Sequence, residues 1–109
     1  MSAANAAWLW VLLGGVFEVV WAVGLKRTDG FTRLVPSAVV VLAMAASLYA
    51  LAQGLKLLPI GTGYAVWVGV GAVGAAAWGI VVEGEPTGVL RLASLALIVA
   101  GIAGLKLAH

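Results

Sequence analysis

Long runs of apolar residues alternate with short polar stretches along the chain, and the polar stretches hold most of its charges. A helix needs about 20 predominantly apolar residues to cross a membrane, because the hydrocarbon core is about 30 Å thick. Four runs are long enough, and they predict helices over about residues 6–25, 34–55, 57–82 and 89–105. We therefore predict an all-α integral membrane protein, in which residues 1–109 form one domain of four transmembrane helices.

The composition indicates that this chain lies in lipid, and it argues against several classes of function. Charged residues make up 9% of it and apolar residues 64%, whereas a soluble domain is about a quarter charged. With no cysteine and one histidine, His109, the chain offers no disulfide and no cluster of metal ligands, so we expect neither a metal nor a cofactor. The net charge of +2 comes without a basic cluster, which gives no indication of nucleic acid as a partner.

The basic residues also bear on orientation, because cytoplasmic loops are enriched in Lys and Arg. Four of the six fall on one side of the predicted membrane, and two fall on the other side together with both termini. This bias is weak. It is compatible with insertion of the chain in both orientations.

Glu18 is the only acidic residue within a predicted span. It follows residue 6 by 12 positions, which places it about 18 Å into the hydrocarbon core and near its midplane. An ionised carboxylate at this depth costs at least about 2.5–3.5 kcal/mol, so it must face protein or water, find a cationic partner or stay protonated. Each outcome points to the handling of protons or cations. The alternative is a protonated glutamate that only makes a hydrogen bond across a helix interface.

Small residues and an indole share the helix face of Glu18. Gly14 and Gly15 precede it by four and three residues, and Trp21 follows it by three. The two glycines leave space for a small ligand. Trp21 can donate its indole N–H to the carboxylate or offer a cation–π face, although the alternative is an interfacial anchor.

Further candidates lie on the second and third predicted helices. Ser47 is a polar residue within the second span, and its alternative role is a hydrogen bond to its own backbone four residues earlier. Tyr64 and Trp67 belong to an aromatic and glycine stripe at helical spacing, which is also compatible with packing alone. Gly69 and Gly71 make the third helix easy to bend, which suits a gate, whereas close packing is the alternative.

The fourth predicted helix carries a seam of small residues, Ser94 and Gly101, at a spacing of seven. Small residues let transmembrane helices approach closely. Four short helices can scarcely enclose a pathway by themselves. We therefore predict a homo-oligomer in which this helix is the contact between subunits.

These residues lie within motifs that closely resemble those of the small multidrug resistance family, and within it the guanidinium exporter branch. The resemblance spans nearly the whole chain. Its most specific stretches are GVFEVVWAVGLK at residues 15–26, GFTRLVPS at 30–37, LPIGTGYAVW at 58–67, GVGAVGA at 69–75 and EP at 85–86. They occur in the expected order and spacing.

The resemblance implies an antiparallel, dual-topology homodimer in the bacterial inner membrane, with one shared site formed by the two Glu18 carboxylates. It implies that this site exports guanidinium in exchange for protons. Trp21 is the mark of the guanidinium branch. The positions that line the site in similar proteins are occupied by Gly15, Ser47, Tyr64 and Trp67. We expect Ser47 and Trp21 to orient the carboxylates by donating hydrogen bonds to them.

Three other interpretations remain open at this stage. The chain could export quaternary ammonium or other lipophilic cations, as a multidrug exporter does, or it could require a second, similar subunit. In a different class, it could be a non-transporting accessory subunit of the membrane. We do not expect an enzyme, because one buried glutamate and a terminal histidine cannot form a pair of nucleophile and base.

Overall fold

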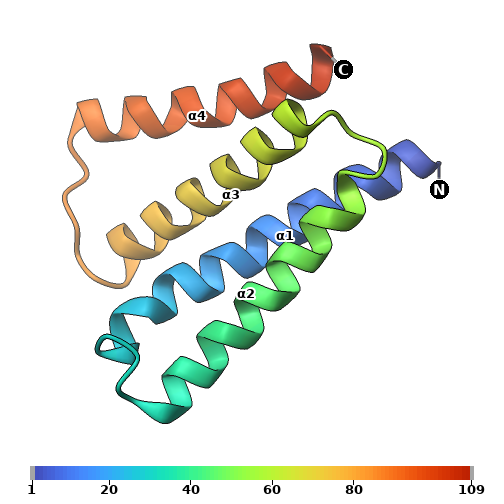
Figure 1. Cartoon of the computed structure of the whole chain (residues 1–109). Coiled ribbons are helices and arrows are strands. Elements are labelled where there is room, and N and C mark those ends of the chain that lie inside the picture. Colours follow the sequence, from blue (N-terminus) through green and yellow to red (C-terminus); the bar gives the residue numbers. More distant parts are fainter. Residues whose placement is uncertain (1, 109) are drawn as a thin grey trace.

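The computed structural model describes residues 2–108, so the single histidine, His109, lies outside the described residues. These residues form four α-helices and one short 3-10 helix, which are α1 (Ala3–Leu25), η1 (Lys26–Thr28), α2 (Leu34–Gly54), α3 (Ile60–Val81) and α4 (Val89–Ala108) (Figure 1). Each α-helix is long and apolar enough to cross a membrane. The prediction of four transmembrane helices is confirmed.

Local sequence explains where several helices begin. Ser2 is the N-cap of α1, and its hydroxyl accepts a hydrogen bond from the backbone N–H of Asn5 at 3.1 Å. Pro59 occupies the N-cap of α3, so that helix begins at Ile60. The prediction had placed the start of this span at residue 57, because the leucines before Pro59 are apolar although they lie in the turn. In the turn between α1 and α2, Gly30 has a φ of 66°, which glycine adopts without steric cost.

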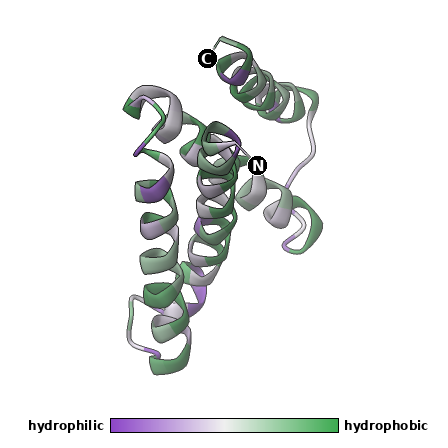
Figure 2. Ribbon diagram, turned by 90° about the vertical axis from the view of Figure 1, so that its right-hand side faces the viewer, coloured by the Kyte–Doolittle hydropathy of each residue, from purple (hydrophilic) through white to green (hydrophobic). Residues whose placement is uncertain are grey.

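The helices lie side by side in the order α2, α1, α3, α4 (Figure 1). Helix α1 packs on both α2 and α3, whereas α2 and α3 make few contacts with one another and α4 contacts α3. Each helix carries apolar residues on most of its circumference (Figure 2), so hydrophobicity alone does not determine which face packs against another helix. In lipid, close packing at small residues makes that selection.

Glycines on one helix receive side chains of the next. A Cβ atom at Gly15 would lie 2.6 Å from Val70 Cγ1 of α3, and one at Gly24 would lie 2.8 Å from Val40 Cγ2 of α2. Both distances are too short for real contacts, so larger residues at these two positions would push the helices apart. The central position of α1 depends on these two glycines.

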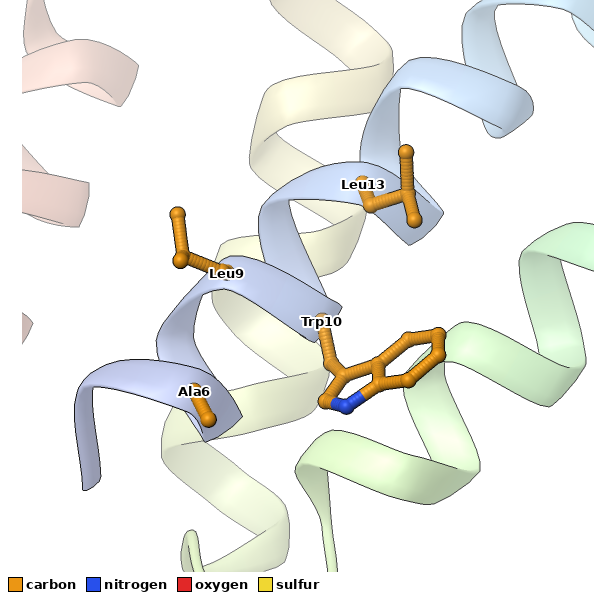
Figure 3. Close-up of a pocket in the computed structure, with 4 residues that line it drawn as sticks. All are labelled: Ala6, Leu9, Trp10 and Leu13. Carbon is orange, nitrogen blue, oxygen red and sulfur yellow. The ribbon is translucent and has the colours of Figure 1, made fainter. Parts of the chain in front are cut away.

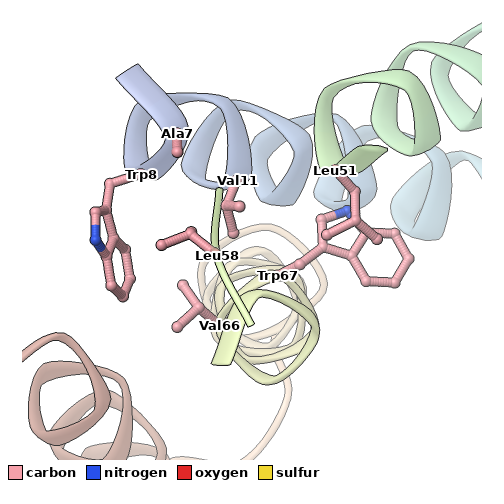
Figure 4. Packing of buried hydrophobic residues seen from close by; sticks show 7 residues of the cluster. All are labelled: Ala7, Trp8, Val11, Leu51, Leu58, Val66 and Trp67. Atoms are coloured by element: carbon pink, nitrogen blue, oxygen red, sulfur yellow. The ribbon is translucent and has the colours of Figure 1, made fainter. Parts of the chain in front are cut away.

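A cluster of buried side chains closes one end of the bundle. It joins α1, α2, α3 and the turn before α3, and its members are Ala7, Trp8, Val11, Leu51, Leu58, Val66 and Trp67 (Figure 4). Val11 and Val66 are fully enclosed. This cluster fixes the three helices relative to one another near the beginning of α1.

Helix α4 makes few contacts with the rest of the chain and stands apart from α1 and α2 (Figure 2). None of its described residues is buried. Ile98 and Ile102 pack over Gly69 of α3, and the ammonium of Lys106 lies 4.8 Å from the ring centroid of Trp8. Nearly all of α4 is therefore left to face lipid or another protein chain.

Candidate cation-binding site

Glu18 lies inside α1 and points at the backbone of α3. A Cβ atom at Gly71 would lie 2.7 Å from Glu18 Cγ and closer still to the carboxyl group. Oxygen Oε1 is buried and has no hydrogen-bond partner among residues 2–108. The missing side chain of Gly71 thus makes the space in which the carboxyl group lies.

Ser47 joins three helices through its hydroxyl group. The side chain is fully buried, donates to the carbonyl oxygen of Gly14 on α1 at 2.7 Å, and accepts from the indole N–H of Trp67 on α3 at 3.0 Å. Within the described chain Ser47 donates neither to Glu18 nor to its own helix, so its hydrogen bond to the carboxylates of a shared site stays a prediction. The hydroxyl has one proton, and the carbonyl of Gly14 takes it.

Tyr64 and Trp67 form a pair on α3, with their ring centroids 5.5 Å apart and their planes tilted by 38°. Trp67 is buried, whereas Tyr64 is 53% exposed. The exposed ring of Tyr64 therefore adjoins the buried chain of hydrogen bonds that runs from Trp67 through Ser47 to Gly14. Structure and sequence agree that these aromatic residues are neighbours.

Trp21 and Gly15 flank Glu18 on α1, as their spacing indicated. Trp21 is partly buried, and no hydrogen bond joins it to Glu18 in the described part of the subunit. Gly15 is buried against Val70 and the backbone of Trp67. The structure therefore leaves the donor role of Trp21 without support in one subunit, while Gly15 serves the approach of α1 to α3.

Gly14 is predicted only to leave space for a ligand, but its carbonyl oxygen is also the acceptor for Ser47. A Cβ atom at Gly14 would lie 3.1 Å from Cδ1 of Trp67 and 3.0 Å from the carbonyl oxygen of Ser47. The adjacent pair Gly14 and Gly15 was the available signal, because two neighbouring glycines on one helix can receive two different helices.

The predicted gate glycines lie in one continuous helix, α3. Gly69 receives Ile102 of α4 and Gly71 receives Glu18, so both make close contacts in the described structure. Their role as a gate remains a prediction. On α4, Ser94 donates to the carbonyl oxygen of Leu90 within its own helix, and Gly101 has open space where a side chain would be. Their role as a subunit contact also remains a prediction.

A groove of about 250 Å³ on the outer face of α1 has no part in this site. Its walls come from Ala6, Leu9, Trp10 and Leu13 (Figure 3). The ring of Trp10 stands edge-on to Tyr49 of α2, with 5.9 Å between centroids. No titratable side chain lines the groove, so it offers no counter-charge to a cation.

Ionic contacts lie at the helix ends, away from Glu18. Lys26 Nζ lies 2.7 Å from Glu83 Oε1, and Arg91 in the first turn of α4 pairs with Glu85 of the segment before it. The hydrogen bond from Lys26, together with the charge of its ammonium, lowers the pKa of the Glu83 carboxyl group below its ordinary value of 4.5. The first pair joins the segment between α3 and α4 to η1 at the end of α1, and the second joins that segment to α4.

The site is suited to binding a small positive charge. A buried carboxyl oxygen without a donor costs about 1–3 kcal/mol, and a proton or a hydrogen-bonding cation would remove that cost. Because the two ligands would use the same oxygen atoms, they would exclude one another. The described residues offer no group of three or more acidic or histidine side chains that could hold a metal ion.

Residues 6–98 match the profile of the family described as Small Multidrug Resistance protein. The chain belongs to the small multidrug resistance family. The predicted resemblance is thereby confirmed, and this member of the family is a multi-pass protein of the bacterial inner membrane.

Curated members of the family are similar to it over almost their whole length. The protein named Guanidinium exporter of Escherichia coli (strain K12) is 59% identical over 101 residues, covering 93% of this chain and 96% of that protein. The Guanidinium exporter of Yersinia pseudotuberculosis is 55% identical over 102 residues, covering 94% of this chain and 98% of its own. Both relatives are named for export and not for an enzymatic reaction.

Proposed function

We propose that this chain exports guanidinium in exchange for protons, and that Glu18 binds both. The observation that carries this proposal is the buried Oε1 of Glu18, which lies within a transmembrane helix and has no partner among the described residues. The high identity to proteins named Guanidinium exporter supports the choice of cation. Guanidinium is planar and can donate two parallel hydrogen bonds to a carboxylate.

The active form we propose is an antiparallel homodimer in which two Glu18 carboxylates share one site. Two facing carboxylates would neutralise a cation better than one, and either two protons or one guanidinium ion would relieve their repulsion. The mostly exposed α4, with Ser94 and Gly101, is the surface we propose for the contact between subunits. The weak charge bias of the loops is compatible with opposite orientations.

Exchange follows from mutual exclusion at the shared site. Protons that enter from one side displace guanidinium, and guanidinium that enters from the other side displaces the protons. A dimer that rocks between two openings would then couple the two movements, as in transporters built from inverted repeats. Trp21, beside Glu18 on the same face, would contact the bound cation through its ring face.

The deciding experiment measures guanidinium-driven proton movement in proteoliposomes that contain only this purified chain. We expect proton flux with the wild type, none with Glu18→Gln, and partial flux with Glu18→Asp. Glu83→Gln is the matched control, because it makes the same chemical change at an exposed carboxyl group of a loop. Flux in Glu18→Gln equal to that of the control would contradict the proposal.

Other outcomes would identify a different function. Proton flux with quaternary ammonium ions but not with guanidinium would indicate a multidrug exporter. No flux with any cation would indicate a missing second subunit or an accessory protein.

Orientation can be tested separately, because the chain has no native cysteine. For a dual-topology protein, we expect a single cysteine at Asp29 to react with an impermeant thiol reagent in about half of the molecules of intact cells.

A further inference from the structure

A second feature of α1 is an apolar groove with a single cation at one end. Its volume is about 440 Å³, within the roughly 300–1,000 Å³ range of small-molecule sites. Five of its six lining residues are valine, glycine or tryptophan, and the sixth is an arginine. They are Val19, Val20, Val23, Gly24, Arg27 and Trp78.

The groove lies beside the Glu18 carboxyl group and not over it. Val19 packs on Gly74 of α3, whereas Glu18 packs on Gly71, and most of the other lining residues of α1 lie on a different face. Val23 follows Glu18 by five residues, or about 140° around the helix. Val20 follows Glu18 by two residues, or about 200° around the helix. The groove is thus separate from the proposed guanidinium site.

One end of the groove lies where the helices leave the membrane. Arg27 belongs to η1, directly after α1, and Trp78 lies in the last turn of α3 at the same end of the molecule (Figure 1). Tryptophan and arginine at such helix ends are typical of the level of the lipid headgroups. From Arg27, the groove extends to Val19, which is about 12 Å along the helix towards the membrane centre.

Arg27 makes no ion pair within residues 2–108. Its guanidinium carbon lies 6.0 Å from the ring centroid of Trp78, and Nη1 donates to the carbonyl oxygen of Val23 at 3.5 Å. The facing segment holds two acids, and both already have a basic partner. Glu83 accepts from Lys26 at 2.7 Å, although the charge of Arg27 also acts on it, and Glu85 pairs with Arg91. The positive charge at the mouth of the groove is therefore open to an anion from outside the subunit.

We propose that this groove binds one phospholipid, with the phosphate on Arg27 and an acyl chain along Val19, Val20 and Val23. A guanidinium group binds phosphate through paired hydrogen bonds, and basic residues next to a membrane attract lipid phosphates. The apolar walls match a hydrocarbon chain. A cationic substrate does not fit this end of the groove, because Arg27 repels it.

Lipid retention by the full-length purified chain tests this proposal. Native mass spectrometry would count phosphatidylglycerol molecules bound per subunit during a lipid titration in detergent. We expect Arg27→Gln to lower the affinity for the tightest lipid on the order of tenfold, the loss expected for a charge-assisted hydrogen bond. Arg33→Gln is the matched control, because Arg33 is exposed, makes no ion pair in the described structure and does not line the groove.

A second pair of variants tests the acyl-chain end without changing charge. Val20→Phe should fill the groove and reduce lipid retention, whereas Val41→Phe on α2 should not. Both valines are exposed, at 43% and 54%, so neither change overpacks the interior. Equal lipid loss in Arg27→Gln and Arg33→Gln would overturn the proposal, because general attraction would then explain binding.

Other occupants of the groove give different results. A change in oligomeric state by Val20→Phe, with lipid retention unchanged, would assign the groove to a second copy of the chain and overturn the proposal. Displacement of the lipid by guanidinium or by a long-chain ammonium ion would assign it to substrate and also overturn it. The assay measures bound lipid, so its result does not depend on guanidinium transport.

Discussion

The contact between Glu18 and Gly71 gives the sharpest test of the site. A methyl group at Gly71 would place a Cβ atom 2.7 Å from Glu18 Cγ. Carbon atoms prefer a separation of about 3.5–4.0 Å, so the glutamate side chain must retreat by about 1 Å in Gly71→Ala. A misplacement of this size at a reacting group can cost on the order of 100-fold in rate.

We therefore expect guanidinium transport by Gly71→Ala to fall on the order of 100-fold. The cost in folding should be about 1–3 kcal/mol, because a flexible side chain can move aside. Gly61→Ala is the matched control, since it makes the same change in the same helix at a position with nothing within 4 Å.

The assay compares guanidinium flux per folded protein in liposomes with the free energy of unfolding in detergent. Loss of flux with most of the protein still folded would show that the position of the carboxylate matters, and not the fold alone. If Gly71→Ala and Gly61→Ala showed the same guanidinium flux, the reasoning would be refuted, because the displaced carboxylate would then work as well as the original one.

Three further predictions concern other parts of the subunit. Ser47→Ala should lose about 1–3 kcal/mol of stability in reversible unfolding, because the buried indole N–H of Trp67 is left without an acceptor. Ser94→Ala, the control, should change the stability by no more than about 0.5 kcal/mol, and equal losses in the two variants would contradict the observed hydrogen bonds. Trp21→Gly should weaken the preference for guanidinium over quaternary ammonium ions in a competition assay, and an unchanged preference would remove Trp21 from the site. Because the pKa of Glu83 is lowered on folding, its ion pair stabilises the protein fully above pH 4.5 and loses this effect as the pH falls through the lower folded value. NMR titration should show that Lys26→Gln returns the pKa of Glu83 towards 4.5, and a titration that is the same in both proteins would exclude the pair.

The helices of this chain could be predicted because lipid imposes a simple requirement on length and polarity. Each predicted span has its observed counterpart, and α2 and α4 begin at the predicted residues. The start of α3 was placed too early, because Leu57 and Leu58 are as apolar as a span although they form a turn before Pro59. Hydropathy measures how favourably a residue transfers from water to lipid, and it does not show that Pro59 precedes the first residue of the helix.

The site could be predicted only as a set of residues. Spacing along a helix placed Gly15 and Trp21 beside Glu18, since residues three positions apart share a face. Which helix each face would meet depends on the register between helices, and a single sequence does not contain it. For this reason the hydrogen bond from Ser47 to Gly14 was missed. The contact of Gly71 with Glu18 was missed for the same reason.

The few contacts of α4 have a consequence for genetic experiments. Substitutions in most proteins confound damage to the fold with damage to assembly. Because α4 has no buried residue among those described, changes along it should leave the other three helices intact, except at the residues that contact them, which are Ile98, Ile102, Leu105 and Lys106. Growth selection on guanidinium across the other positions of α4 would therefore map the contact that we propose between two copies of the chain, with little background from misfolded protein.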